Sequence, residues 1–257
     1  MESHSVLLLL GAGLAGGVVT AIVGGASLIT FPALLAAGLP PIVANASNVV
    51  ATTPGNLMAG LADIERLPRW NRSFLGLVLV SIAGSVAGAF LLLLTPEKAF
   101  TAVVPLLIGF ATTLFALSGR VRLWILARPD THRRVSSDGL GLLMFIPVAI
   151  YGGYFGAGMS VMLLAILSVS LTGEFRAINV VKNLLAALTG VVPAIVFIVQ
   201  GEVVAWWPTL IMMVGTVLGG FLGGRLVRVL SPGLVRSIVI TVGSILTVVY
   251  AWRYWWN

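Results

Sequence analysis

The chain contains no cysteine and few charged side chains. Of its 257 residues, 8 are acidic, 15 are basic and 59% are hydrophobic, and the mean hydropathy is +1.09. A typical soluble domain is about 45–50% apolar and about 25% charged. So few charges cannot cover the surface of a water-soluble protein of this size. The composition excludes a soluble globular domain, a disordered chain and a disulfide-rich secreted domain, and it predicts a polytopic membrane protein that lies in a lipid bilayer.

The lack of cysteine also excludes disulfides, zinc–thiolate sites and iron–sulfur clusters. Histidine occurs only at His4 and His132, outside the middle of any apolar run. We therefore expect no metal site, no cofactor and no catalytic residue. The net charge of +7 comes mostly from arginines in short polar stretches. This pattern is typical of membrane orientation, and we expect no nucleic-acid partner.

Apolar runs occupy most of the chain. A transmembrane helix needs about 20 apolar residues to cross a hydrocarbon core of about 30 Å. Two runs, the first and the fifth, exceed 30 residues, and as straight helices each would reach about 48 Å at about 1.5 Å per residue. The eight runs cover residues 5–37, 42–62, 73–94, 99–118, 139–170, 177–200, 204–224 and 234–252.

Both long runs contain a glycine cluster near the middle. The first has Gly24-Gly25-Ala26-Ser27, and the fifth has Gly156-Ala157-Gly158-Met159-Ser160. Because glycine tolerates irregular backbone, we predict that each long run breaks there and folds back as a V-shaped helical hairpin. The alternative is that these small residues form helix-packing surfaces.

The two halves of the chain resemble each other in the order of their features. Gly25 and Ser27 recur 133 positions later, and the Asn45–Asn48 pair corresponds to Asn179 and Lys182 at a shift of 134. Such weak internal similarity is typical of transporter repeats. We predict an all-α membrane protein with a first repeat at residues 1–118, an Arg-rich linker at 119–138 and a second repeat at 139–257.

The positions of the arginines predict how the repeats are oriented. If both long runs fold back, the basic stretches 62–73, 119–138 and 225–236 all lie on one side of the membrane. Positively charged loops are usually cytoplasmic. The expected protein therefore has a cytoplasmic linker, both termini in the periplasm, and two inverted repeats, each a broken hairpin followed by three transmembrane helices.

Hairpins that enter from opposite faces would bring their tips together near the midplane. Inverted-repeat transporters bind substrate there, with half-helix N-termini directed at anionic groups. Ser27 and Ser160 follow the glycines, where we expect them to act as N-caps. The helix after the first hairpin carries Asn45, Asn48, Thr52 and Asn56 at spacings that place them on one face. Each asparagine could instead bond a neighbouring helix.

Lys182 is the one lysine within an apolar run of the second repeat. A lysine at the centre of a membrane helix costs about 2.5–3.5 kcal/mol on insertion scales, and no acid in that helix could pair with it. It either binds an anion or extends to the nearby interface. The predicted substrate-binding residues are Gly24, Gly25, Ala26, Ser27, Asn45, Asn48, Gly156, Ala157, Gly158, Met159, Ser160, Asn179, Lys182 and Asn183.

These motifs resemble those of the TauE/SafE sulfite exporter family, also called the toluene sulfonate uptake permeases. The resemblance rests on Gly24-Gly25-Ala26-Ser27 with Pro32, on Asn45-Ala46-Ser47-Asn48, on the stretch 151–158 (YGGYFGAG) and on 177–185 (AINVVKNLL). It spans nearly the whole chain. The sequence departs from the family pattern at Ala26 and at Met159-Ser160, where many members carry a further glycine.

The resemblance implies a bacterial inner-membrane secondary transporter of small anions such as sulfite and sulfonates. We expect alternating access at the midplane site, and we also consider a homodimer. An anion channel on the same scaffold stays open as an alternative. An intramembrane enzyme that acts on a lipid phosphate is disfavoured, because it would need an activated nucleophile or paired acids, and the apolar runs hold neither a histidine partner for serine nor an acid pair.

Overall fold

The computed structural model describes residues 3–22, 24–61, 72–127, 140–170, 175–226 and 231–256. Within these ranges all regular secondary structure is α-helical, which confirms the predicted fold class. The helices are α1 (Ser3–Ile22), α2 (Ser27–Ala36), α3 (Pro41–Leu61), α4 (Arg72–Leu94), α5 (Glu97–Leu126), α6 (Leu140–Tyr154), α7 (Met159–Ser170), α8 (Phe175–Gln200), α9 (Trp206–Leu226) and α10 (Pro232–Trp255).

Both long apolar runs are broken at their glycine clusters. The first forms α1 and α2, and the fifth forms α6 and α7. Positive φ angles at the breaks, +80° and +100° at Gly24 and Gly25 and +75° and +78° at Gly156 and Gly158, belong to a region that side chains with a Cβ rarely adopt. The prediction of interrupted helices is therefore confirmed, because only glycine enters this region without strain.

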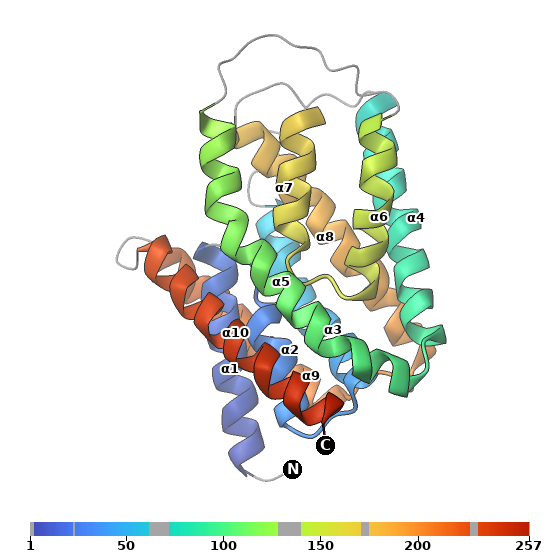
Figure 1. Ribbon diagram of the computed structural model, residues 1–257, viewed down its shortest axis with the longest axis vertical. Helices are drawn as coiled ribbons and strands as arrows, with labels where there is room; N and C mark the ends of the chain where they lie inside the picture. The colour runs from blue at the N-terminus through green and yellow to red at the C-terminus, as the bar shows by residue number, and fades with distance from the viewer. Residues whose placement is uncertain are drawn as a thin grey trace.

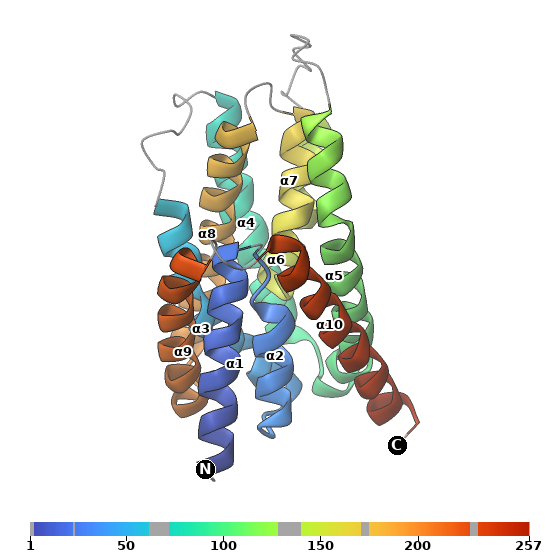
Figure 2. The same ribbon diagram turned by 90° about the vertical axis from the view of Figure 1, so that its left-hand side faces the viewer.

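The two broken hairpins extend from opposite ends of the molecule. In Figure 1, α6 descends from the upper end and α7 returns to it, whereas the N-terminus and the start of α1 lie at the lower end. Figure 2 shows α2 running back down beside α1. The two loops that join the half-helices meet near mid-height, where residues of both line one cavity.

Helix packing between the two halves is reciprocal. The first helix of each half packs on the fourth helix of the other, so α1 contacts α9 and α6 contacts α4. The third helices, α3 and α8, contact each other, as do the fifth helices, α5 and α10. Each of these contacts is reproduced when the two halves are exchanged.

Small residues allow the closest of these contacts. A Cβ at Gly17 of α1 would overlap the carbonyl oxygen of Thr216 in α9, and a Cβ at Gly88 of α4 would overlap that of Ile150 in α6. The backbones therefore touch directly, as in small-residue membrane interfaces. Helix packing on small residues was the alternative considered for the two glycine clusters. It applies instead to Gly17 and Gly88.

Within the described residues, six helices are long and apolar enough to cross a membrane, judged by length and composition. The outer surface carries large apolar side chains such as Leu7, Leu94 and Val199, which are 68%, 79% and 80% exposed. Such a surface suits lipid and not water. A multi-pass membrane protein is thereby confirmed. Helix α5 continues to Leu126, so the first part of the expected linker 119–138 is helical, and residues 128–139 lie outside the described ranges.

Replacing Gly17 by Ala tests the close contact between α1 and α9. The new methyl group must displace the α9 backbone, and overpacking of this kind costs about 1–3 kcal/mol. We expect a lower midpoint in thermal unfolding of the detergent-purified protein. The control is Gly11→Ala in the same helix, where no atom lies within 4 Å of the added Cβ and helix propensity improves by up to about 1 kcal/mol. Equal midpoints for the two variants would contradict the contact.

Candidate functional site

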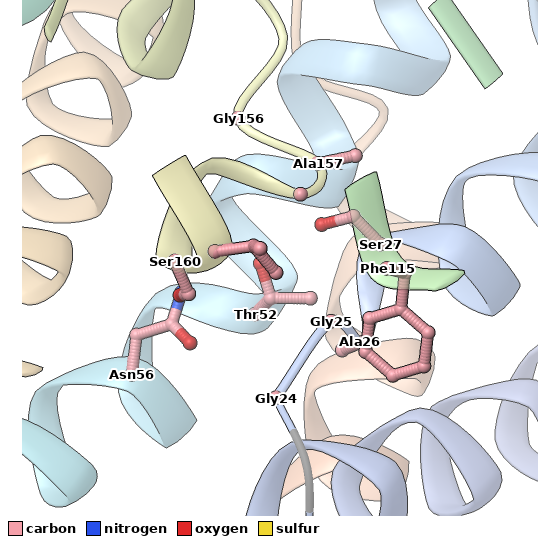
Figure 3. A pocket seen from close by; sticks show the side chains of 12 residues that line it. Gly24, Gly25, Ala26, Ser27, Thr52, Asn56, Phe115, Gly156, Ala157 and Ser160 are labelled. Atoms are coloured by element: carbon pink, nitrogen blue, oxygen red, sulfur yellow. The ribbon is translucent and has the colours of Figure 1, made fainter. Parts of the chain in front are cut away.

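A polar cavity lies where the two hairpin tips meet. It consists of two adjoining chambers of about 60 Å³ each. Both chambers are lined by Ser27, Thr52, Asn56, Gly156 and Ser160, so residues of α2, α3 and the α6–α7 hairpin converge on the same space (Figure 3). A single water molecule needs about 10–15 Å³ of such cavity volume. Each chamber therefore has room for about four waters or a small oxyanion.

The two chambers differ in their remaining walls. The first is closed by the tip of the first hairpin, the second tip and the ring of Phe115 from α5: Gly24, Gly25, Ala26, Ala157, Gly158, Phe115 and Val161. The second extends toward α8 and the end of α6: Val49, Gly152, Phe155, Met159, Ala186, Thr189 and Gly190.

Several hydrogen-bond donors that face this cavity are not used inside the protein. Within the described part of the chain, Ser160 Oγ and the Asn56 amide make no hydrogen bond, and Ser27 Oγ accepts one from Asn48 Nδ2 (3.1 Å), which leaves its own hydrogen free. The described lining residues include no acidic side chain. A ligand that accepts hydrogen bonds is therefore the one that this lining suits.

The N-termini of α2 and α7 add to this preference. The helices begin at Ser27 and Met159, beside the cavity, and a helix N-terminus carries a partial positive charge of about +0.5. Among the described residues, the backbone N–H groups of Ala157 and Gly158 donate no hydrogen bond. Free amides at a helix N-terminus favour an anion.

Neither serine acts as the N-cap that we expected. Helix α2 has Ala26 at its N-cap in helical conformation, without a side-chain capping bond, and Ser27 is the first helical residue. Helix α7 starts at Met159, so Ser160 is already inside the first turn. The N-cap prediction was wrong because α2 begins one residue and α7 two residues earlier than expected, and this leaves both hydroxyl groups at the cavity instead of on the backbone.

All nine predicted residues of the two glycine clusters line the cavity, whereas the predicted residues Asn45, Asn48, Lys182 and Asn183 do not. Asn48 is buried and holds the first tip, with Thr30 Oγ1 donating to its Oδ1 (2.5 Å) and its Nδ2 donating to Ser27. Asn45 is buried and its Nδ2 donates to the carbonyl of Tyr154 at the end of α6 (2.8 Å). Their contact with substrate stays a prediction.

Lys182 and Asn183 lie on α8 away from the cavity wall. Lys182 is four residues before Ala186 and seven before Thr189, so it lies on the helix face that lines the second chamber, about 6 Å from Ala186 and about 10 Å from Thr189 along the axis. It is half-buried, and within the described residues it has neither a hydrogen-bond partner nor an ion-pair partner. The side chain of Asn179 lies outside the described residues.

Comparison with known proteins decides the family. The family model described as Sulfite exporter TauE/SafE matches residues 9–250. The chain belongs to the TauE/SafE family. A Haemophilus influenzae protein named Probable membrane transporter protein is 26% identical over 95% of this chain and 93% of its own length. Escherichia coli K12 YfcA, which bears the same description, is 28% identical over 90% of this chain and 84% of its own.

A Sinorhizobium relative, Probable membrane transporter protein ORF9, is 27% identical over 95% and 92% of the two chains. No solved structure matches this chain. Membership of the TauE/SafE family confirms the resemblance drawn from the motifs, and it confirms a membrane transporter and not an enzyme.

Sequence reasoning missed part of the cavity wall of this TauE/SafE protein. Thr52 and Asn56 continue the polar face of α3 that Asn45 begins, and this spacing was the signal for them. No sequence signal pointed to Phe115, because it is one of many apolar residues in α5. Thr189 and Gly190 lie slightly more than one turn beyond the motif at 177–185 on α8, and only the helix crossing brings them to the cavity.

The tip glycines can be tested with a matched pair of variants. Ala at Gly25 (φ +100°) or at Gly38 (φ +89°) is strained and costs about 1–2 kcal/mol. Only at Gly25 does the added Cβ also meet the Phe115 ring, at 2.9 Å, since nothing lies within 4 Å of it at Gly38. We expect both variants to unfold at lower temperature and only Gly25→Ala to lose anion flux in proteoliposomes. Loss of flux in Gly38→Ala alone would contradict this assignment.

Proposed function

We propose that this protein is a secondary transporter of small anions, with sulfite, sulfonates and related sulfur-containing organic anions as its substrate class. The family description, sulfite exporter, supports this class. The single observation that carries the proposal is the cavity itself, in which unused hydroxyl and amide donors and two helix N-termini surround a space of oxyanion size. The bound anion would accept hydrogen bonds from Ser27, Asn56 and Ser160 and from backbone amides of the tips.

In the proposed mechanism, the two halves rock around this cavity and expose it to each side of the bacterial inner membrane in turn. Reciprocal packing of α1 on α9 and of α6 on α4 supports an arrangement of two inverted repeats at residues 1–118 and 139–257. The arginine distribution supports a cytoplasmic linker at 119–138 and periplasmic termini.

Lys182 has a role outside the binding cavity in this proposal. It lies on the same face of α8 as Ala186 and Thr189, about one and two turns nearer the start of the helix, toward the side of the Arg-rich linker. An unpaired cation there raises the local concentration of anions before they reach the cavity. This placement explains why no acidic partner accompanies it, since a salt bridge would cancel the attraction.

The first test measures flux of labelled sulfite, methanesulfonate and chloride in proteoliposomes with Ser160→Ala. A hydrogen bond to a charged group contributes about 1.5–3 kcal/mol, so we expect the apparent KM for the transported anion to rise by about 10- to 100-fold. The control is Ser168→Ala in the same helix, because the Ser168 hydroxyl bonds only the carbonyl of Ala165 (2.7 Å).

An unchanged KM in Ser160→Ala would contradict the proposed site. Flux of none of the three anions by the wild-type protein would contradict the proposed substrate class. The same preparation separates carrier from channel: a carrier saturates and is accelerated by unlabelled anion on the opposite side, whereas a channel shows neither effect.

A second test concerns Lys182. We expect Lys182→Gln to slow anion entry several-fold at low ionic strength, with the deficit shrinking as salt is added, because screening removes long-range attraction. Lys182→Arg keeps the charge and should behave as wild type. If Lys182→Gln lowers the flux equally at all salt concentrations, Lys182 contacts the anion directly, and unchanged flux would remove it from the mechanism.

A further inference from the structure

The end of α6 exposes unpaired carbonyl groups inside the protein. Its carbonyl at Tyr151 accepts from two amides, those of Phe155 (2.9 Å) and Gly156 (3.1 Å). The carbonyls of Gly152 and Gly153 therefore receive no backbone hydrogen bond within the described part of the chain. The C-terminus of a helix carries a partial negative charge of about −0.5. A concentration of negative potential thus lies next to the second chamber, which Gly152 lines.

Asn45 adds a further unpaired oxygen at the end of α6. Its side chain is fully buried (0% exposed), and its Nδ2 donates to the carbonyl of Tyr154, the last residue of α6. Its Oδ1 is buried without a hydrogen-bond partner. Exchanging the two ends of the amide would not remove the problem, because Oδ1 would then face the Tyr154 carbonyl oxygen. A buried acceptor left unpaired is costly, so Oδ1 needs a partner from outside the polypeptide.

The chemistry around Asn45 favours a metal cation over a proton. The only acidic residue within a described helix is Glu97, the exposed first residue of α5, so the described membrane-spanning helices hold no carboxylate beyond this helix end to carry a proton. Neutral amide and carbonyl oxygens are instead the ligands by which broken transporter helices hold Na⁺. Glu97 accepts from the amide of Ile42 (3.3 Å), about one turn from Asn45 on α3, and it would attract cations toward this point.

We propose that an alkali cation, Na⁺ in the first instance, binds between Asn45 Oδ1 and the carbonyl groups at the end of α6, and that it is transported together with the anion. This inference rests on the proposed function. The loop at residues 155–158 joins the two sites, because it follows the α6 carbonyls and also presents the amides of Ala157 and Gly158 to the anion cavity. A cation that fixes the end of α6 therefore fixes the anion-binding amides.

The experiment compares NaCl, KCl and choline chloride at equal concentration. For the wild-type protein in detergent, we expect Na⁺ to raise the thermal unfolding midpoint in a saturable way, and an inward Na⁺ gradient to accelerate uptake of labelled sulfite or methanesulfonate at least about tenfold over choline. In Asn45→Leu both effects should disappear. In Asn45→Asp, which keeps Oδ1, replaces the donor Nδ2 by a second oxygen and adds a negative charge, half-saturation should occur at a lower Na⁺ concentration. If Asn45→Leu does not fold, the shift in half-saturation of Asn45→Asp provides the test.

The control is Ser81→Ala in α4, a buried hydroxyl that bonds only the carbonyl of Leu77 (2.8 Å), which should keep the full response to Na⁺. Anion flux that is the same in all three salts, with no Na⁺ effect on the midpoint, would overturn the cation site and leave the proposed function intact. In that case a water molecule satisfies Asn45. A Na⁺-dependent midpoint that Asn45→Leu abolishes, without flux of any tested anion, would support the cation site and overturn the proposed function.

Discussion

The absence of water from the hydrocarbon core constrains every other feature of this protein. Backbone N–H and C=O groups there must be satisfied inside the protein, yet two helices are interrupted at mid-height. Both breaks persist because α3 lies against them. Its buried side chains bond the first tip through Asn48, the second hairpin through Asn45 and the segment before α9 through Ser47. Helix α3 thus carries buried polar side chains between apolar helices, and its hydrogen bonds hold both hairpins.

Close backbone contact is the second requirement of this arrangement. Polar tips at this depth must be shielded from lipid by the surrounding helices, and glycines in α1, α4 and α9 bring those helices together at backbone distance. Glycine therefore has two unrelated functions in this chain. At Gly24, Gly25, Gly156 and Gly158 it permits positive φ, and at Gly17 and Gly88 it removes a side chain from a helix interface. A substitution affects conformation in the first group and packing in the second.

The broken helices and the cavity-lining tips could be predicted because they depend on local quantities, namely run length, span length and glycine conformation. The positions of Asn45, Asn48 and Lys182 relative to the cavity could not, because they depend on how deep each tip reaches along α3 and α8. Helical spacing places Asn45, Asn48, Thr52 and Asn56 on one face, but it does not say which end of that face meets the cavity. The structure puts Thr52 and Asn56 there and leaves Asn45 and Asn48 to bond the hairpins.

A site built from neutral donors suits the proposed transport better than a fixed ion pair would. A carrier must release its substrate on the far side, so binding must be strong enough for entry and weak enough for exit. Hydroxyl, amide and backbone N–H groups at two helix N-termini distribute a modest positive potential over the cavity, whereas a lysine in the wall would hold a small anion through a full charge in a medium of low dielectric. Keeping Lys182 about one to two turns of α8 away from the wall residues Ala186 and Thr189 separates attraction from binding, and the anion can leave the cavity without breaking a salt bridge.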